Sequence, residues 1–208
     1  MPRTSTARGA AIAAAAGLFR RHGYAATGLE EILAASGAPK GSFYHHFPGG
    51  KEELAVQSLE FSGGRVRELI DRAAAVAPTA GALVSAIADK QAADLRESGY
   101  ELGCPVATVA LELAGESDAI ARASWSAFED WIEPLAERLR GDGRGKADAH
   151  RLARWAVAGL EGALVLARAA RDASVVTDAA AITARFLDHA PGGSDDDASG
   201  ARTREAGR

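Results

Sequence analysis

The sequence predicts an all-α protein of about nine helices. Alanine, leucine and charged residues dominate its 208 positions, runs of β-branched residues are short, and the alternating pattern of strands is absent. Hydrophobic residues make up 47% of the chain and charged residues 25%, which is typical of a folded globular protein.

The first helix is expected over residues 5–22. Ile12 and Phe19 share one face at helical spacing, so this helix needs a partner that covers them. Gly23 follows directly, and glycine commonly ends a helix because it adopts the left-handed conformation without strain.

A second and a third helix are expected at residues 28–36 and 39–46. Thr27 followed by Glu30 fits a capping box, in which the two side chains satisfy backbone amides at a helix start. Gly37 then permits a sharp turn between the two helices. The segment therefore has the order helix, glycine turn, helix.

Six longer or later helices complete the predicted fold. Ser117 and Thr177 are candidate N-caps for two of them, because their hydroxyls can accept from backbone amides. The six are expected over residues 51–75, 80–97, 105–113, 118–140, 148–172 and 178–189.

Charge is distributed unevenly along the chain. The net charge is −4, yet residues 1–51 carry six basic and two acidic side chains, a net charge of +4 that leaves −8 on the remainder. A basic module on an acidic body is expected where one end of a protein meets phosphate and the other does not.

Several classes of protein are excluded or disfavoured. No uninterrupted apolar stretch approaches the roughly 20 residues that a bilayer span requires. Cys104 is the only cysteine, which rules out an intrachain disulfide and a cysteine zinc cluster. His45 and His46 are adjacent, so they point about 100° apart on a helix and do not form the usual metal-binding pair. We expect a cytoplasmic binding protein without metal, cofactor or membrane partner.

Residues 27–51, TGLEEILAASGAPKGSFYHHFPGGK, carry the richest functional pattern. A helix-turn-helix needs a first helix held against the DNA backbone, a tight turn, and a second helix whose outward residues reach base edges. Phe43 and Phe47 are four apart and should face inward. The residues expected to project outward are Lys40, Gly41, Ser42, Tyr44 and His45.

This segment resembles the DNA-binding domain of TetR-type repressors, whose second motif helix commonly reads like KGSFYHHF at residues 40–47, with a lysine soon after. Gly49-Gly50, and Gly103-Cys104-Pro105 before an apolar helix, resemble the LmrA/YxaF-like branch of that family. The first likeness covers about the first quarter of the chain. It implies a homodimeric repressor that binds double-stranded operator DNA and is released by a small hydrophobic or aromatic effector.

The resemblance also implies which residues meet DNA. Thr27 and Gly28 would contact phosphate through a hydroxyl and backbone amides, Lys51 would do likewise, and His46 would meet phosphate or pack at the edge. Arg3 and Arg8 are either a DNA-reaching arm or solvated charges. The implied contact set is Thr27, Gly28, Lys40, Gly41, Ser42, Tyr44, His45, His46 and Lys51.

The effector pocket is harder to assign. Trp125 and Phe128 share a helix face, but such a pair also occurs as plain core. Glu112 either hydrogen-bonds a ligand or faces solvent, and Cys104 is expected to be a small buried hydrophobe rather than a redox sensor. The candidate ligand-binding residues are Cys104, Val109, Glu112, Trp125, Phe128, Trp131 and Trp155.

The last two helices are the expected dimer interface, because operator half-sites mirror a two-fold axis and small residues permit close helix approach. The alternative is a core seam within one chain. The candidate interface residues are Trp155, Ala158, Gly159, Gly162, Ala163 and Leu166.

Three segments follow from these patterns. Residues 1–50 are expected to form a helix-turn-helix DNA-binding domain, residues 51–190 a ligand-binding and dimerisation domain, and residues 191–208 a disordered tail without large apolar side chains. The alternative function is a dimeric helical scaffold or small-molecule-binding protein without DNA readout. An α-helical enzyme has little support, since no nucleophile elbow or phosphate loop occurs.

Overall fold

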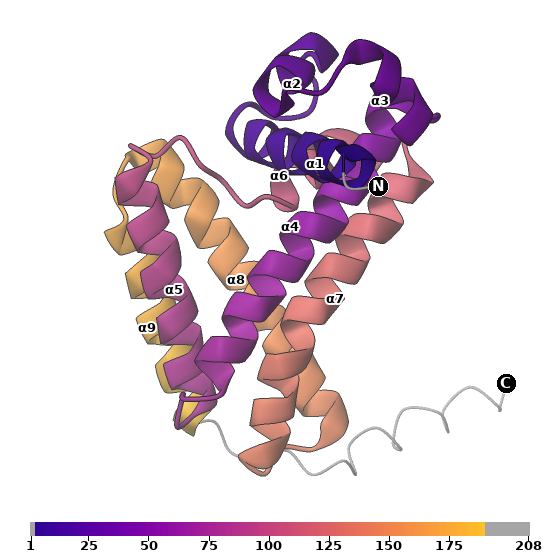
Figure 1. Ribbon diagram of the computed structural model, residues 1–208. Coiled ribbons are helices and arrows are strands. Elements are labelled where there is room, and N and C mark those ends of the chain that lie inside the picture. The colour runs from indigo at the N-terminus through magenta and orange to yellow at the C-terminus, as the bar shows by residue number, and fades with distance from the viewer. Residues whose placement is uncertain (1–2, 190–208) are drawn as a thin grey trace, which may run out of the picture.

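The computed structural model describes residues 3–189, which form nine α-helices and no strand (Figure 1). This confirms the predicted all-α class. The helices are α1 (Arg3–His22), α2 (Leu29–Ser36), α3 (Lys40–His46), α4 (Gly50–Ala74), α5 (Ala80–Glu97), α6 (Ala107–Leu113), α7 (Asp118–Gly141), α8 (Lys146–Ala170) and α9 (Ser174–His189).

Helices α1 to α3 form a head at one end of the molecule, and α4 to α9 form the body below it (Figure 1). Helix α4 leaves the head and runs along α7, while α5 packs on α9 and α8 packs between α7 and α9. Helix α6 lies against α1 and α7. The head is therefore joined to the body through α1, α4 and α6.

Several predicted helix ends are confirmed. Gly23 has φ +85° and its amide donates to the Phe19 carbonyl at 2.9 Å, which ends α1. Gly37 has φ +66° and ends α2, and the hydroxyl of Ser117 accepts from the Ile120 amide at the start of α7. These ends depend on contacts only a few residues away in the chain.

The capping box expected at the start of α2 is wrong. Gly28 precedes the helix without a side-chain cap, and the Thr27 hydroxyl instead donates to the Gly23 carbonyl at 2.7 Å. Thr27 is completely buried. Its hydroxyl therefore stabilises the turn between α1 and α2 rather than the helix that follows.

The predicted start of the last helix is also wrong. Helix α9 begins at Ser174, and the Thr177 hydroxyl donates to the Ser174 carbonyl at 2.9 Å inside the first turn. The Asp172 carboxylate accepts from the Ser174 amide at 2.9 Å. Asp172 therefore satisfies a backbone amide at the start of α9, a role that the sequence analysis did not predict.

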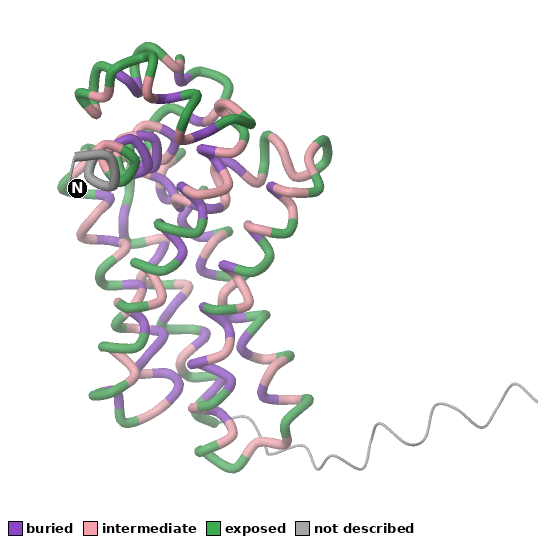
Figure 2. Tube along the Cα trace, turned by 45° about the vertical axis from the view of Figure 1, so that its right-hand side comes forward, coloured by how far each residue is buried: buried purple, intermediate pink, exposed green. Residues whose placement is uncertain are grey.

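A continuous buried core runs from the head into the body (Figure 2). Phe43 and Phe47 are buried in the head as predicted. In the body, α4 and α7 approach so closely at Gly63 that a Cβ there would lie 2.8 Å from the Cβ of Ala127. The Trp131 indole donates to the Gly63 carbonyl at 3.0 Å across the same contact.

Two further expectations concern the membrane and the tail. No helix in residues 3–189 is long and apolar enough to cross a membrane. The expected tail at residues 191–208 lies outside the described residues, and the domain boundary at residue 50 stays a prediction, since α4 begins there and runs unbroken from head to body.

Candidate functional site

Helix α3 carries an aromatic inner face and a polar outer face. Phe43 and Phe47 are buried with ring centroids 5.1 Å apart, and they anchor the helix to the head. Tyr44 is 55% exposed, although its ring meets Phe43 edge-on at 5.3 Å. The other expected outward residues are exposed at Lys40, Gly41 and His45 and partly exposed at Ser42 and His46.

Lys40 is held by an ion pair at the exposed end of this face. Its Nζ lies 3.0 Å from Oε1 of Glu30 on α2. The hydrogen bond from the ammonium to Glu30 raises the pKa of Lys40 above its ordinary value, so the side chain is charged at physiological pH. Any acceptor or anion that binds this ammonium must compete with Glu30.

Lys51 does not project freely from the start of α4. Its Nζ donates to the Tyr24 carbonyl at 2.6 Å and lies 4.0 Å from the centroid of the Tyr24 ring. Burial lowers the pKa of Lys51, while the charge of Glu112 opposes that shift. Lys51 and the buried Thr27 thus hold the α1–α2 turn. The expected contact between the Thr27 hydroxyl and phosphate is wrong for this structure, because that side chain does not reach the surface.

Glu112 joins the body to the head. Its carboxylate accepts from the Tyr24 amide at 2.9 Å and from the Ala25 amide at 2.7 Å. A Cβ at Gly23 would lie 2.2 Å from Glu112 Oε1, so the neighbouring glycine is what admits the carboxylate. Glu112 was expected either to hydrogen-bond a ligand or to face solvent. It is exposed and lies outside the cavity lining, which agrees with the second alternative, and its carboxylate also holds the α1–α2 turn from α6.

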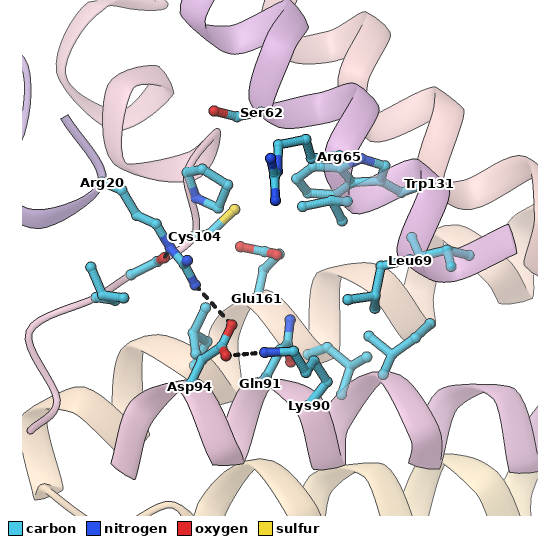
Figure 3. Close-up of a pocket in the computed structure, with 18 of the residues that line it drawn as sticks. Arg20, Ser62, Arg65, Leu69, Lys90, Gln91, Asp94, Cys104, Trp131 and Glu161 are labelled. Atoms are coloured by element: carbon cyan, nitrogen blue, oxygen red, sulfur yellow. Dashed lines mark hydrogen bonds and ion pairs between the residues drawn. The ribbon is translucent and has the colours of Figure 1, made fainter. Parts of the chain in front are cut away.

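A cavity of about 730 Å³ lies in the body directly beneath the head (Figure 3). Its lining comes from α1, α4, α5, α7, α8 and the loop between α5 and α6. Apolar side chains such as Val66, Leu69, Val84 and Leu135 make up much of the wall. Cavities of this size and character commonly accept drug-sized molecules.

Cys104 and Trp131 line this cavity, as expected. The other expected ligand residues do not. Phe128 packs edge-on against Trp131 at 5.2 Å, and Val109 is buried in the core. Trp125 and Trp155 are about half exposed on the outer surface. The prediction failed for them because helical spacing identifies a shared face but not which neighbour that face meets.

Nine polar or charged cavity residues were missed: Arg20, Ser62, Arg65, Glu68, Arg72, Lys90, Gln91, Asp94 and Glu161. They come from four helices, and no local pattern links them. The one usable signal was Glu161, an acidic residue in a stretch of α8 that is otherwise small and apolar.

Glu161 and Cys104 are buried titratable groups of the cavity, and both have shifted pKa values. Burial raises the pKa of the Glu161 carboxyl to about 7, and the hydrogen bond with Cys104 opposes that shift. Its Oε2 is buried and has no hydrogen-bond partner. Burial and then the charge of Glu161 raise the pKa of the Cys104 thiol well above its ordinary value, so the thiol is neutral and a poor nucleophile.

Arg20 connects the cavity to the head. It belongs to α1, and its Nε donates to the Gly103 carbonyl at 2.7 Å while Nη2 lies 3.3 Å from Oδ2 of Asp94. Lys90 also pairs with Asp94 (Figure 3). The first helix of the head is therefore part of the cavity wall. Within residues 3–189, no group of three His, Cys, Asp or Glu side chains is placed to hold a metal ion.

An exposed apolar face covers α8 and α9. Trp155 and Phe186 meet at 5.2 Å between ring centroids, and both are about half exposed. Val165, Leu166 and Ile182 extend the face and are more exposed still. Ala158, Gly159 and Gly162 are also on α8 and at least partly exposed, whereas Ala163 is buried within the chain and does not belong to this surface.

The fold and these sites define a class: helical DNA-binding proteins with a helix-turn-helix head and a separate cavity in the body. Comparison with known families makes the assignment specific. Residues 11–57 match the model of bacterial regulatory proteins of the tetR family, and residues 80–182 match the C-terminal domain of LmrA/YxaF-like transcriptional regulators.

Relatives agree with these matches. An uncharacterized HTH-type transcriptional regulator of Mycobacterium tuberculosis is 37% identical over 167 residues, which cover 77% of this chain and 84% of the relative. The HTH-type regulator LmrA of Bacillus subtilis is 30% identical over 163 residues, covering 78% and 87%. The chain belongs to the TetR family of DNA-binding transcriptional regulators, which confirms that it is a regulator rather than an enzyme.

Solved structures share the fold. A TetR regulator from Chloroflexus aurantiacus has a TM-score of 0.74 at 28% identity, covering 91% of this chain and 98% of that one. The TetR-family regulator CifR, solved in complex with 26 bp double-strand operator DNA, has a TM-score of 0.72 at 24% identity and covers 85% and 94%.

Proposed function

We propose that this regulator is a homodimeric repressor that binds operator DNA in the cytoplasm and leaves it when a small hydrophobic or aromatic effector enters the cavity. The observation that carries the proposal is the sharing of α1: the helix that supports the helix-turn-helix also supplies Arg20 to the cavity wall. A molecule that fills the cavity therefore touches the head without any intermediate element.

Operator contact is assigned to the outer face of α3. Lys40, Tyr44 and His45 are exposed there, and Gly41 leaves room for close approach to DNA because a Cβ at this position would have no neighbouring atom within 4 Å. Gly28 is exposed at the start of α2, where backbone amides favour phosphate. CifR, which shares this fold, is solved in complex with double-strand operator DNA, which supports operator binding by a protein of this fold.

A second connection runs through α6. Gly103, Cys104 and Pro105 line the cavity and lead directly into this helix. Near its end, Glu112 holds the amides of the α1–α2 turn. An effector that shifts the loop would move α6 and with it the attachment of the head, which changes the DNA affinity if the two head positions differ in DNA contact.

The exposed face of α8 and α9 supports dimerisation. Its apolar side chains come from two adjacent helices, and small residues lie between them, which is suited to close packing against a second copy. Two heads related by a two-fold axis match a palindromic operator.

Binding to the DNA upstream of the protein's own coding region tests this proposal. We expect a discrete complex at near-physiological salt in excess nonspecific DNA, with an affinity that falls as salt rises. The variants Lys40→Ala and Tyr44→Ala should each weaken it about tenfold, consistent with 1–3 kcal/mol per contact. Arg122→Ala, an exposed site on α7, is the control.

Release is tested by adding small apolar molecules to that complex. At least one compound should dissociate it and should also raise the melting temperature of the DNA-free protein. Absence of sequence-preferring binding across a genome-wide selection would contradict the repressor function and favour a dimeric scaffold. DNA binding that no cavity ligand alters would contradict only the ligand response.

A further inference from the structure

The cavity contains two buried oxygen atoms that lack hydrogen-bond donors. Glu161 enters from α8 and Gln91 from α5, and both point into the same space (Figure 3). Glu161 Oε2 and Gln91 Oε1 are each buried without a partner. A buried acceptor without a donor costs free energy, so these atoms are positions where a bound molecule gains by donating.

The charges around these oxygens limit what the molecule can carry. Arg65 reaches into the cavity from α4 and stacks over the Phe61 ring at 5.8 Å, with no ion pair to any described residue. Arg20 and Lys90 share the single carboxylate of Asp94. Arg72 and Glu68 also line the cavity, so with Glu161 the wall holds four cationic and three acidic side chains.

We infer that Glu161 and Gln91 select an uncharged effector that presents hydrogen-bond donors, hydroxyl or amide N–H groups, from an otherwise apolar body. This inference rests on the proposed function and names the chemistry that the cavity accepts. A hydroxyl that donates to Glu161 Oε2 satisfies that oxygen without adding charge, and its own oxygen remains free to accept a hydrogen bond.

Charged ligands meet opposition from the same residues. An ammonium group would gain from Glu161 but would enter a wall whose cationic side chains outnumber its acidic ones by four to three. A carboxylate would gain from Arg65 but would place a second acid beside Glu161. It would also bring two acceptors and no donor to the unpaired oxygens of Glu161 and Gln91. The apolar wall also opposes the transfer of either ion from water.

A series of naphthalene probes of nearly equal size tests the inference on the full chain without DNA. Affinities for 2-naphthol, 2-methoxynaphthalene, 2-naphthoate and 2-naphthylmethylammonium are measured at pH 7 by titration calorimetry. We expect 2-naphthol to bind about tenfold more tightly than 2-methoxynaphthalene, which lacks the donor, and more tightly than either ion.

Variants identify the residues responsible. Glu161→Leu and Gln91→Leu should reduce the preference for 2-naphthol, and Glu161→Gln, which keeps an oxygen acceptor and the size of the side chain, should retain part of it. Glu60→Gln removes an exposed carboxylate from α4 outside the cavity lining and should leave the preference unchanged. Circular dichroism excludes variants that fail to fold.

Equal affinities for 2-naphthol and 2-methoxynaphthalene, including no binding of either, would overturn the inference, as would tightest binding of the ammonium or the carboxylate. A preference that survives in both Glu161→Leu and Gln91→Leu would overturn the assignment to these residues. Operator binding is measured on the same samples. If it persists while the probe preference is absent, the donor chemistry is wrong and the DNA-binding function stands.

Discussion

Among single residues, Glu112 makes the most direct contact between body and head. The carboxylate holds two backbone amides of the α1–α2 turn, at Tyr24 and Ala25. We expect Glu112→Ala to weaken operator binding about tenfold, because charge-assisted hydrogen bonds contribute roughly 1.5–3 kcal/mol and the freed turn no longer fixes α2. Fluorescence anisotropy with labelled operator DNA measures the change.

The nearby exposed Glu116 gives the matched control for that substitution. Glu116→Ala removes the same charge close to α6 without touching the head. If both variants bind operator equally well, the contact of Glu112 has no role in positioning the head.

Glu30 restrains Lys40, a lysine that we propose to contact DNA. Its carboxylate pairs with Lys40 in the free protein and brings a negative charge toward the DNA. We expect Glu30→Gln to tighten operator binding several-fold, because it releases Lys40 and removes repulsion of phosphate. Glu31→Gln removes a charge from the adjacent position, where the structure shows no ion pair to a described residue. An equal gain in both variants would show that charge alone matters and that the pair does not.

Glu161 should make stability depend on pH. Its pKa is about 7 in the folded chain and near the ordinary value of 4.5 when unfolded. The folded state then binds the extra proton between these values, so the free energy of unfolding falls as pH rises from 4.5 through 7. We expect Glu161→Gln to be more stable than the parent at pH 8, by up to about 3 kcal/mol, with little difference at about pH 4.5. Urea denaturation of the ligand-free protein at both pH values measures this, and a constant difference would contradict it.

At the scale of helices, the sequence predicted most of the architecture. Some helix ends depend on hydrogen bonds to residues within a few positions, as at Gly23, Gly37 and Ser117. Such local signals can be recognised from the sequence alone. Thr27 failed as a cap because the compact α1–α2 turn buries it, which is a tertiary effect.

The outer face of α3 could be predicted from the sequence and the cavity could not, and the reason is again the range of the contacts. The outward face of α3 follows from the spacing of Phe43 and Phe47 alone. Glu112 meets amides 87 and 88 positions away, and the cavity is assembled from side chains of six segments. No periodicity in a single sequence encodes such pairings.

The contact of α4 with α7 depends on Gly63. A Cβ there would lie 2.8 Å from Ala127, and the Trp131 indole bonds to the Gly63 carbonyl. We expect Gly63→Val to destabilise the chain by about 1–3 kcal/mol, because overpacking forces the helices apart. Thermal unfolding measures the effect.

The next residue supplies the control. Gly64 is exposed, and a Cβ there would have no neighbouring atom within 4 Å, so Gly64→Ala should stabilise α4 by roughly 0.5–1 kcal/mol. Destabilisation by both substitutions would point to a general intolerance of α4 to side chains here rather than to the contact with α7.

At the scale of the whole molecule, the face on α8 and α9 should hold two copies together. Leu166 is 62% exposed within one chain. We expect Leu166→Glu to shift the protein from dimer to monomer, because it places a charge in an apolar interface, and to weaken operator binding by more than about tenfold through loss of the second head. Light scattering after gel filtration measures the mass.

Val76 provides the comparison, since it is 83% exposed just beyond the end of α4 and belongs to neither α8 nor α9. Val76→Glu should leave both the mass and the operator affinity unchanged. A Leu166→Glu variant that stays dimeric would place the interface elsewhere.

Helix α1 belongs to two sites at once, since Ala16, Gly17 and Arg20 face the cavity while the same helix packs under α2. Thermodynamic linkage is reciprocal. If an effector lowers the affinity for DNA by some factor, DNA lowers the affinity for the effector by the same factor. Under the proposed release by an effector, the operator-bound protein is the weaker sensor, and copies of the regulator that are not on DNA capture the effector first. The concentration at which a promoter responds is therefore set by the number of its binding sites as well as by the chemistry of the cavity.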